Sequence, residues 1–518
     1  MILSDISLPI PYTEEMLFRG IRKKAQNKNL KIKNVTLLKR SIDARKKPNL
    51  RYVLTVKVNE PDPPYRLPEK SCLRTEKRTV VVGAGPAGLF AALTLLRAGI
   101  PVLLLERGED VEHRKETVSA FWKTGRLNPD SNVQFGEGGA GTFSDGKLNT
   151  QTHSPLNDEV LRIFTAMGAK EEILYDQKPH IGTDALLGVM KTFRETIIRL
   201  GGEVRFHATL TDLDVKVGRL SGIIVNENEK IPCDSLVLAL GHSARDTFSM
   251  LKKRGLHLEQ KAFALGIRIE HPEKMITEDQ YGTLDYECLG AAPYKLTYKT
   301  KDGRGVYTFC MCPGGYVVNA SSEPEKLCIN GMSYAARDGE NSNSALVVQV
   351  LPSDFPDSDV LSGVEFQRSI EKKAFFAGEG KIPVQILADF MKGVKTTRFG
   401  AYKPMMKGQY AFADLNEILP PYIAESLKEA IPEFGKRIRG FDREDAILSC
   451  VEARTSSPVR IVRDENGESN VKGIFPAGEG AGYSGGILSS AKDGLEIAGK
   501  IIESVFGRSA EPTSAEKQ

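Results

Sequence analysis

The residues with the most specific chemistry form a glycine triplet, Gly83-x-Gly85-x-x-Gly88. The β-branched run Thr79–Val82 precedes the triplet and the apolar segment 89–99 follows it, which predicts a strand, a tight turn and a helix. In such a turn Gly83 makes the bend, Gly85 lets the backbone approach a pyrophosphate, and Gly88 lets the helix pack on the strand. The start of the helix adds free N–H groups and a partial positive charge, so this stretch predicts a dinucleotide site.

An acidic residue follows at the distance that such a site requires. A second predicted strand, Val102–Leu105, ends at Glu106, which lies 23 residues after Gly83, and Arg107 comes next. A carboxylate at the tip of this strand is placed to accept hydrogen bonds from a ribose. A chance glycine-rich turn is the alternative, and it is disfavoured because strand, helix, second strand and acid all fall at the right spacing.

A second glycine-rich stretch covers residues 136–147, with five glycines and two hydroxyl side chains. This composition predicts a loop without helix or strand, whose backbone can wrap closely around a ligand. Gly138, Gly139 and Ser144 are the expected contacts, and Lys147 would place a positive charge beside a phosphate or an electron-rich ring. A mobile surface loop is the alternative interpretation.

A third strand end carries the most conspicuous histidine. The predicted strand 235–239 runs into Gly241 and His242 and then opens a helix, which indicates another close approach of backbone to a nucleotide. His242 is a candidate for chemistry. The more common role of such a residue is a hydrogen bond to backbone at a helix start, and we favour that interpretation.

The last glycine-rich segment follows a predicted strand at residues 473–476. Gly478 and Glu479 come next, and Gly485, Gly486 and Ile487 open a helix with an apolar face. Glu479 is placed to accept a hydrogen bond from a sugar or ribityl hydroxyl. The N–H groups and the dipole at the start of the helix would stabilise negative charge on a ligand.

Taken together, these glycine-bearing strand ends resemble the FAD-binding pattern of the glutathione-reductase-type flavoprotein superfamily. In that pattern G-A-G-P-A-G binds the ADP pyrophosphate, and the terminal A-G-E-G segment runs past the flavin ribityl chain. The loop 136–150, with the N-terminal unit, is similar to bacterial proteins described only as FAD-dependent dehydrogenases, and more distantly to other flavoproteins of obscure substrate. Glu479 departs from the pattern, because many relatives carry aspartate there.

The resemblance implies FAD as the cofactor, with NAD(P)H as a candidate transient electron donor and no metal. The residues expected to contact FAD are Gly83, Gly85, Pro86, Ala87, Gly88, Glu106, Arg107, Gly138, Gly139, Ser144, Lys147, Gly241, Gly478, Glu479, Gly485, Gly486 and Ile487.

These motifs require an α/β fold with a discontinuous, Rossmann-like FAD-binding domain. We predict its first part at 76–260 and its second part at 441–507, with a mixed-sheet substrate domain inserted at 261–440. A nicotinamide dehydrogenase has no need for the C-terminal motif. A second strand–G-x-G-x-x-G–helix unit is missing from the sequence, since 377–381 lacks the spacing, which disfavours a disulfide reductase with two nucleotide domains.

A small basic α/β unit is predicted before this fold, at residues 1–60. We expect strands near Ile2–Leu8, Lys31–Leu38 and Tyr52–Val58, with a charged helix around Glu14–Gln26. The proline-rich stretch 61–75 is predicted to be a linker, because proline disfavours both helix and central strand. Residues 508–518 are predicted to be a disordered tail.

Charge is distributed unevenly along the chain. The net charge is +4, but residues 1–78 carry 19 Lys and Arg against 8 Asp and Glu, whereas the remainder carries 52 against 59. A basic segment on an acidic body favours either nucleic acid, an anionic surface or an acidic partner, or else simple docking onto the body. We favour docking, because the aromatic residues needed for base stacking are sparse there.

Composition excludes several other classes. The longest apolar runs are too short to span a membrane, and the N-terminus lacks the pattern of a signal peptide. Seven scattered cysteines without metal-type pairs suit a reducing cytoplasm. Cys310 and Cys312 are expected on one face of a strand, as buried structural residues in preference to a redox pair.

The sequence therefore predicts a cytoplasmic FAD-dependent oxidoreductase that transfers hydride between an unidentified small molecule and flavin N5. The alternative is a flavoprotein that acts on or with nucleic acid through its basic N-terminal unit. Lys147 and His242 are candidates for catalysis, Tyr294 and Tyr316 are eligible by type, and nothing in the sequence ranks them. Substrate, electron donor and oligomeric state are not predicted.

Overall fold

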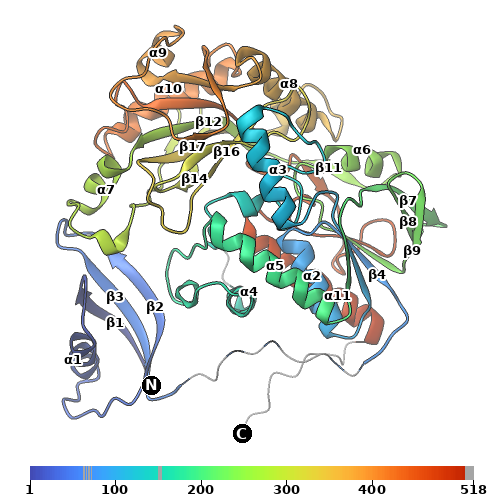
Figure 1. Cartoon of the computed structure of the whole chain (residues 1–518), viewed down its shortest axis with the longest axis horizontal. Coiled ribbons are helices and arrows are strands. Elements are labelled where there is room, and N and C mark those ends of the chain that lie inside the picture. Colours follow the sequence, from blue (N-terminus) through green and yellow to red (C-terminus); the bar gives the residue numbers. More distant parts are fainter. Residues whose placement is uncertain (62–64, 66, 68–70, 72, 150–153, 508–518) are drawn as a thin grey trace.

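The computed structural model describes residues 1–518 apart from 62–64, 66, 68–70, 72, 150–153 and 508–518 (Figure 1). A parallel sheet with its helices occupies one part of the molecule, and a larger mixed sheet lies above it in this view (Figure 1). The predicted disordered tail, and most of the predicted linker, lie outside the described residues.

The nucleotide-type domain is built on a five-stranded sheet in which every neighbouring pair is parallel. In spatial order its strands are β23 (Ile474–Pro476), β10 (Ser235–Leu238), β4 (Thr79–Val82), β5 (Val102–Leu105) and β6 (Glu203–Arg205). β-Branched and leucine residues fill the inner strands, which are buried on both faces, as parallel sheets require. The carboxyl ends of β4, β10 and β23 therefore meet at one edge.

Two long helices cover one face of this sheet at close range. They are α2 (Pro86–Arg97) and α11 (Ile487–Phe506). A Cβ on Gly88 would lie 1.8 Å from the carbonyl oxygen of Gly83, and a Cβ on Gly494 would lie 2.2 Å from that of Ala87. Glycine at these two positions thus allows helix to contact turn and helix to contact helix, as predicted for Gly88.

The remaining helices and a small sheet complete the domain. The helices α4 (Pro155–Ala166) and α5 (Thr183–Arg199) extend the core beside α2, and α3 (Val111–Thr124) packs outside α5. An antiparallel meander of β7 (Leu210–Lys216), β8 (Arg219–Val225) and β9 (Glu229–Pro232) joins α6 (Arg245–Lys253) on the other face. The sequence did not predict β7 and β9.

The inserted domain is built on a seven-stranded mixed sheet, which confirms the predicted fold class. In spatial order its strands are β13 (Thr297–Lys299), β14 (Gly305–Cys312), β17 (Asn341–Val350), β12 (Phe263–Pro272), β21 (Ile447–Glu452), β18 (Ile382–Ile386) and β20 (Tyr410–Phe412). The predicted return to the nucleotide domain at residue 441 is wrong, because β21 pairs with β12 and β18 within this sheet.

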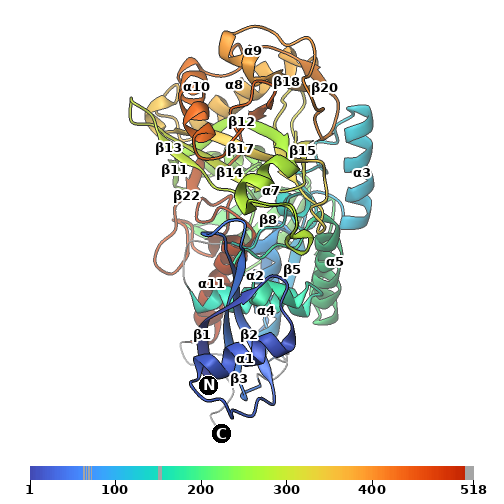
Figure 2. The same ribbon diagram turned by 90° about the vertical axis from the view of Figure 1, so that its left-hand side faces the viewer.

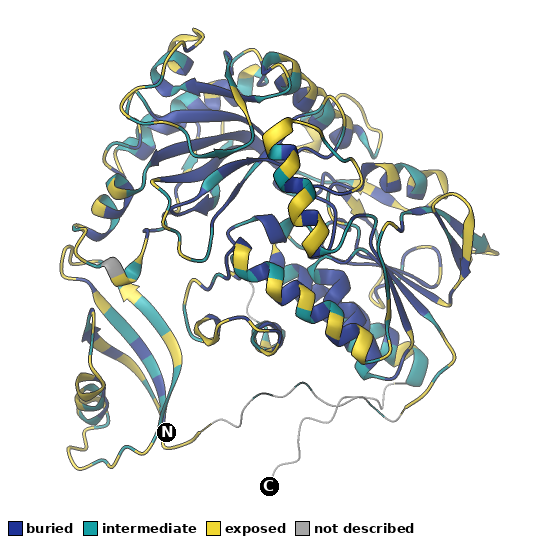
Figure 3. Ribbon diagram, in the orientation of Figure 1, coloured by how far each residue is buried: buried dark blue, intermediate teal, exposed yellow. Residues whose placement is uncertain are grey.

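Helices and a second small sheet cover the two faces of the inserted domain. The helices α7 (Glu273–Tyr281), α8 (Ser362–Ala377), α9 (Leu387–Lys392) and α10 (Pro421–Gly435) accompany the large sheet, and β15 (Tyr316–Asn319), β16 (Ile329–Met332) and β19 (Met406–Lys407) form the small one. The central strands are buried along nearly their whole length (Figure 3). A two-stranded ribbon, β11 (Leu258–Gln260) with β22 (Val459–Ile461), lies at the junction of the two domains.

The N-terminal unit is a three-stranded antiparallel sheet with one helix, at a corner of the molecule (Figures 1 and 2). Its order is β1 (Ile2–Pro9), β3 (Arg51–Val58) and β2 (Val35–Asp43), and α1 (Glu14–Lys24) packs on it. β2 starts four residues later than the predicted strand Lys31–Leu38. Phe18 and Tyr52 pack partly buried against the unit's own core, which leaves less aromatic surface for base stacking.

The loop at 136–147 also differs slightly from its prediction. It contains a short 3₁₀ turn, Ala140–Phe143, which follows two glycines with positive φ, Gly138 and Gly139. Among the described residues, none of the helices has both the length and the apolar character to cross a membrane.

Candidate functional site

A cavity of about 310 Å³ opens between the carboxyl ends of the parallel strands and the inserted domain. One side is formed by the ends of β4, β5, β10 and β23, the loop 136–147 and the start of α11. The opposite side comes from the inserted domain and the segment that follows it, namely Phe309, Cys310, Asn330, Glu452, Arg454 and Thr455.

Most of the predicted ligand contacts line this cavity. Those that do are Gly83, Gly85, Pro86, Ala87, Glu106, Arg107, Gly139, Ser144, Lys147, Gly241, Glu479, Gly485, Gly486 and Ile487. Gly88, Gly138 and Gly478 lie just behind the surface, where an added Cβ would collide with Gly83, Thr142 and Ala87 respectively. Segments separated by nearly 400 residues therefore meet around one space, although their contacts with a ligand remain a prediction.

Bare backbone forms the floor of the cavity. A Cβ placed on Gly241, Gly485 or Gly486 would meet no described atom within 4 Å. It would instead project into open space at the cavity surface, where a ligand could approach the peptide groups. Gly83 has φ of +103°, and a Cβ there would lie 2.2 Å from the carbonyl oxygen of Ala239, so only glycine fits the first turn.

Two helices begin at this floor without a side chain to cap them. The N-cap residues of α2 and α11 are Gly85 and Gly486, and neither helix receives a capping hydrogen bond from a described side chain. The first N–H groups of an α-helix have no partner within the helix, and they carry the positive end of its dipole. The cavity thus presents two sets of donors that suit phosphate or another anion.

Glu106 holds the floor together. One carboxylate oxygen accepts from Ala84 N at 2.9 Å, and the other accepts from Gly108 N and Gly136 N, each at 3.0 Å. An ionised carboxylate offers about four acceptor positions, so one remains for a ribose hydroxyl. The structure thus adds a role that the sequence did not predict, since Glu106 joins the first turn to the glycine-rich loop.

Glu479 has the opposite surroundings. Its carboxylate lines the cavity and accepts no hydrogen bond from the residues that the structure describes. Burial raises its pKa to about 7, and the charge of Lys261 opposes this shift. The side chain is half-buried at the cavity surface, and its carboxylate has acceptor positions left for a hydroxyl supplied by a ligand.

Two cations at the cavity are already engaged. Lys147 Nζ donates to the carbonyl oxygen of Met311, and Asp145 lies 3.9 Å away. Arg107 pairs with Asp246 at 2.9 Å and lies 4.4 Å from the centre of the Phe135 ring. Lys147 therefore lines the cavity, and it also ties the loop to β14 of the inserted domain.

Of the candidate bases, one lines the cavity and two do not. His242 lines the cavity and its Nδ1 lies 3.0 Å from the hydroxyl of Ser243. Burial, with the charges of Arg454 and Arg245, lowers the pKa of His242 to about 3. The ring is therefore neutral near pH 7, and it is a weak base there. Tyr294 and Tyr316 do not line the cavity.

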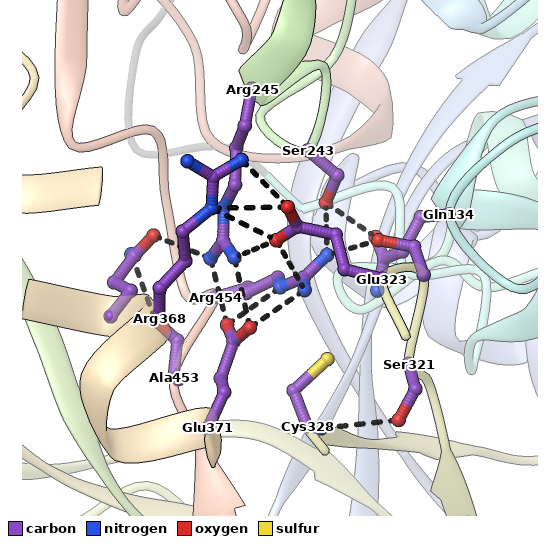
Figure 4. Close-up of polar contacts among 12 residues, drawn as sticks. Gln134, Ser243, Arg245, Ser321, Glu323, Cys328, Arg368, Glu371, Ala453 and Arg454 are labelled. Atoms are coloured by element: carbon purple, nitrogen blue, oxygen red, sulfur yellow. Dashed lines mark hydrogen bonds and ion pairs between the residues drawn. The ribbon is translucent and has the colours of Figure 1, made fainter. Parts of the chain in front are cut away.

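A buried cluster of charges crosses the domain junction next to Ser243 (Figure 4). Glu371 on α8 binds Arg245 on α6 through two hydrogen bonds of 2.7 and 2.8 Å, and binds Arg454 through two of 2.8 Å. Glu323 adds a 2.6 Å contact to Arg245 and also pairs with Arg368. Burial alone would raise the pKa of Glu371, but the two guanidiniums hold it well below its usual range.

A second buried pair lies beside the first. Arg268 on β12 contacts Glu452 at 2.8 Å and donates to the carbonyl oxygen of Cys310 at 2.6 Å. Burial raises the pKa of Glu452 although Arg268 opposes the shift. The hydrogen bond from Arg268 fixes the backbone of Cys310 at the cavity surface. On the side of the inserted domain, Glu452 and Arg454 line the cavity, and Arg268 and Glu371 pair with them from the protein interior.

Cys310 and Cys312 do not sit on a regular strand. The register of β14 shifts between Phe309 and Cys312, and Cys310 has φ of +45°. The predicted alternation of faces is therefore wrong here. Cys310 lines the cavity, whereas Cys312 is buried and its thiol donates to the carbonyl oxygen of Cys310 at 3.3 Å. Both thiols are free.

Comparison with known proteins agrees with this geometry. Residues 77–260 match the family described as pyridine nucleotide-disulphide oxidoreductase, and residues 262–455 match the FAD-dependent protein, C-terminal domain-like family. Residues 1–59 match a domain of unknown function, DUF8436. An uncharacterized protein of Clostridium beijerinckii is 48% identical over 97% of this chain and 98% of its own length.

The chain belongs to the FAD-binding flavoprotein oxidoreductase superfamily. Solved structures similar to this flavoprotein include CtdE in complex with FAD, with 13% identity, a TM-score of 0.33, and coverage of 83% of this chain and 89% of that one. Glycine oxidase from Bacillus cereus has 10% identity and a TM-score of 0.32, over 83% and 96% of the two chains. With TM-scores below 0.5, these likenesses support no argument about the flavoprotein's activity.

The sequence did not identify the charged side of the flavoprotein's cavity. Glu452, Arg454 and Glu371 stand in ordinary strand, loop and helix sequence, without a local motif. The sole available signal was the position of charged residues within otherwise apolar segments such as β12 and β21, where Arg268 and Glu452 lie. A charge in a buried strand predicts a partner, but it does not say which one.

Proposed function

We propose that this flavoprotein catalyses hydride transfer between a small-molecule substrate and FAD bound in the cavity. The observation that carries the proposal is the meeting of the glycine-bearing ends of β4, β10 and β23 at one cavity with the uncapped starts of α2 and α11. Open space over the Cβ positions of Gly241, Gly485 and Gly486 supports the fit of an extended dinucleotide.

FAD, when bound, supplies a hydride acceptor and donor at flavin N5. In the proposal, the N–H groups of Gly85 and Ala87 hold the pyrophosphate, and Glu106 offers its remaining acceptor position to the ribose. Glu479 accepts a hydrogen bond from a hydroxyl of the ribityl chain. The start of α11 at Ile487 stabilises negative charge at the other end of the cofactor.

The inserted domain forms the substrate side in this proposal. Phe309 and Cys310 provide a mostly apolar surface, and Asn330 provides a neutral polar group. The charges of Glu452 and Arg454 are balanced by Arg268 and Glu371 behind them. We therefore expect this side to orient the substrate by shape and hydrogen bonds, with little net charge.

The proposal is tested by the absorption spectrum of the purified protein, followed by anaerobic addition of NADH and then NADPH. A two-banded flavin spectrum that bleaches with one donor is the expected result, and it names that donor. A bound flavin that bleaches with neither would contradict a nicotinamide donor. Failure to bind FAD after reconstitution would overturn the proposed function itself.

A further inference from the structure

The N-terminal unit carries a concentrated positive charge. Residues 1–59 contain 14 Lys and Arg against 4 Asp and Glu, a net charge of +10. Between Glu15 and Asp43 the sequence has nine Lys and Arg and no acid at all. The whole chain has a net charge of only +4, so the rest of the molecule is acidic. The positive charge is thus concentrated in a unit whose residues do not line the cavity.

The unit is joined to the rest of the molecule along one half of its sheet. Arg40, in the second half of β2, binds both carboxylate oxygens of Asp176 at 2.6 and 2.9 Å. Leu50 N, just before β3, donates to the hydroxyl of Tyr286 at 3.3 Å. The other end of the sheet, where β1 and β2 begin and β3 ends, carries the N-terminus and lies away from these contacts (Figures 1 and 2). We call it the outer end of the unit.

The loop that joins α1 to β2 is fixed at this outer end. Arg22, on the last turn of α1, donates through Nε to the carbonyl oxygen of Leu30 at 3.2 Å, which holds the loop against the helix. Asn59 follows β3 and holds the loop from the other side. Its side-chain amide donates to the carbonyl oxygen of Lys31 at 2.8 Å, and its side-chain oxygen accepts from Lys33 N at 2.7 Å. The loop is therefore attached to both the helix and the sheet.

Five exposed lysines belong to this loop and to the end of α1. We call them the outer lysines: Lys23, Lys24, Lys28, Lys31 and Lys33. Their ammonium groups form neither a hydrogen bond nor an ion pair with the residues that the structure describes. The acid at the same end, Glu60, is bound by the ammonium of Met1. The charge of the outer lysines is thus uncompensated and accessible to a partner.

The surroundings of the outer lysines distinguish between anionic partners. A membrane surface is bound best by cations beside apolar side chains that enter the lipid. Met1 and Ile2 are exposed, but the loop packs its own apolar side chains, Leu30 and Ile32, against the core of the unit. Single-stranded nucleic acid is bound largely by aromatic stacking, whereas the phosphates of a duplex require only cations. The aromatic residues of the unit pack against its core, so the loop favours a duplex.

We propose that the outer lysines bind the phosphate backbone of duplex nucleic acid and do not read its bases. Each ammonium that neutralises a phosphate releases condensed counterions, and this release drives the association. Contacts with phosphates fix the position of a protein on a duplex without sequence information. Because the loop is already held by Arg22 and Asn59, less conformational entropy is lost on binding. The inference is independent of hydride transfer, since the outer lysines do not line the cavity.

The test uses the full-length protein loaded with FAD and fluorescein-labelled duplexes of RNA and of DNA. Binding is followed by fluorescence anisotropy between about 50 and 200 mM KCl. The loop variant combines Lys28→Ala, Lys31→Ala and Lys33→Ala, and a second variant carries arginine at the same three positions. The matched control removes three exposed lysines outside the N-terminal unit, by Lys253→Ala, Lys392→Ala and Lys395→Ala.

We expect the loop variant to bind both duplexes at least about tenfold more weakly at the lowest salt concentration. The slope of log K against log salt should become shallower by about one for each lysine removed. The arginine variant and the matched control should bind like the wild type. Melting temperature and FAD content should not change in the loop variant, because the three side chains are exposed.

Equal affinities of the loop variant and the wild type for both duplexes would overturn the inference, as would a wild type that binds neither duplex at the lowest salt concentration. Vesicles containing phosphatidylserine and a poly-glutamate peptide are measured as the other anionic probes. If the loop variant lost binding to one of these while its affinity for the duplexes stayed unchanged, the outer lysines would belong to a membrane or an acidic protein, and the inference would be wrong.

Discussion

The nucleotide side of the cavity is made of bare backbone, whereas the inserted-domain side is made of buried charges held in pairs. The first, which we call the glycine wall, comprises residues 83–87, 136–141, 239–241 and 485–487. The second, the charged wall, comprises Glu452 and Arg454 with the partners Arg268, Glu371 and Arg245 behind them. Both walls face the same space, but they are stabilised by different physics.

Because of this difference, changes in the two walls are expected to affect different properties of the protein. A peptide group at the glycine wall is polar but uncharged. Its N–H donor can therefore stay unpaired in the absence of a ligand at a smaller cost in free energy than a buried charge. A carboxylate such as Glu371 is stable in the interior only while both of its arginines remain. A side chain added at an open glycine of the glycine wall should therefore reduce cofactor binding and spare the fold, whereas the loss of a charge from the charged wall should reduce stability first.

The largest effect is expected from Glu371→Ala. This change leaves the buried guanidiniums of Arg245 and Arg454 without their shared carboxylate, and breaking a buried ion pair costs about 3–5 kcal/mol. Urea denaturation should show that loss in the free energy of unfolding. Glu365→Gln on the same helix is the control, because its carboxylate is mostly exposed and should cost little. Similar losses in the two variants would contradict the comparison.

The next largest effect is expected from Glu106→Gln, which tests a buried carboxylate that joins two segments of the glycine wall. The amide nitrogen of glutamine would face N–H donors that the carboxylate now accepts from, leaving buried donors unpaired at a cost of about 1–3 kcal/mol. We expect both a lower melting temperature and a lower FAD content. Full FAD content with unchanged stability would show that Ala84, Gly108 and Gly136 do not depend on this carboxylate.

Gly485→Val should separate binding from folding. Its Cβ would meet no described atom within 4 Å, so the cofactor-free protein should keep its stability. The added side chain would occupy the space where a ligand approaches α11, and steric overlap of this kind costs about 1–3 kcal/mol, or tenfold or more in FAD affinity. Gly499→Ala, within α11 and with similar open space around its Cβ, should retain wild-type FAD affinity in the same titration.

The smallest effect is expected from the pH response of Glu479. Its pKa is raised to about 7 in the cofactor-free fold, from an ordinary value near 4.5. The folded state therefore holds this proton more tightly than the unfolded state, and stability falls as pH rises from about 4.5 to 7. Glu479→Gln should reduce that decline in melting temperature. An unchanged profile between pH 5 and 7.5 would show that the carboxylate is not the group responsible.

The parts that the sequence predicted are those with local physical signatures. Gly83 has a positive φ in its turn, and Gly88 is required by its contact with the carbonyl oxygen of Gly83 in the same turn. The apolar run Thr79–Val82 indicates a buried parallel strand by composition alone. Local signatures of this kind place most of the predicted residues at the cavity surface, while their contacts with a ligand stay a prediction.

The charged wall depends on distant pairs, and local sequence does not specify them. Arg245 and Glu371 are 126 residues apart, and Arg268 and Glu452 are 184 apart. The same limit explains the error at residue 441, since β21 is assigned to its sheet by pairing with β12 and not by its own composition. The bulge at Cys310 is likewise fixed by its neighbours, including the hydrogen bond from Arg268 to its carbonyl oxygen.

The hydrogen bonds from Arg245 to Glu371 also limit how the two domains can be exchanged between proteins. Arg245 belongs to the nucleotide-type domain, while Glu371 belongs to the inserted domain, so neither domain has a complete set of buried charges by itself. A chimaera that places residues 262–455 on another dinucleotide-binding domain would contain the buried carboxylate of Glu371 with Arg454. It would lack Arg245, the second arginine that binds this carboxylate. The two domains are thus expected to be exchanged in evolution, or in protein engineering, only together with the residue that joins them.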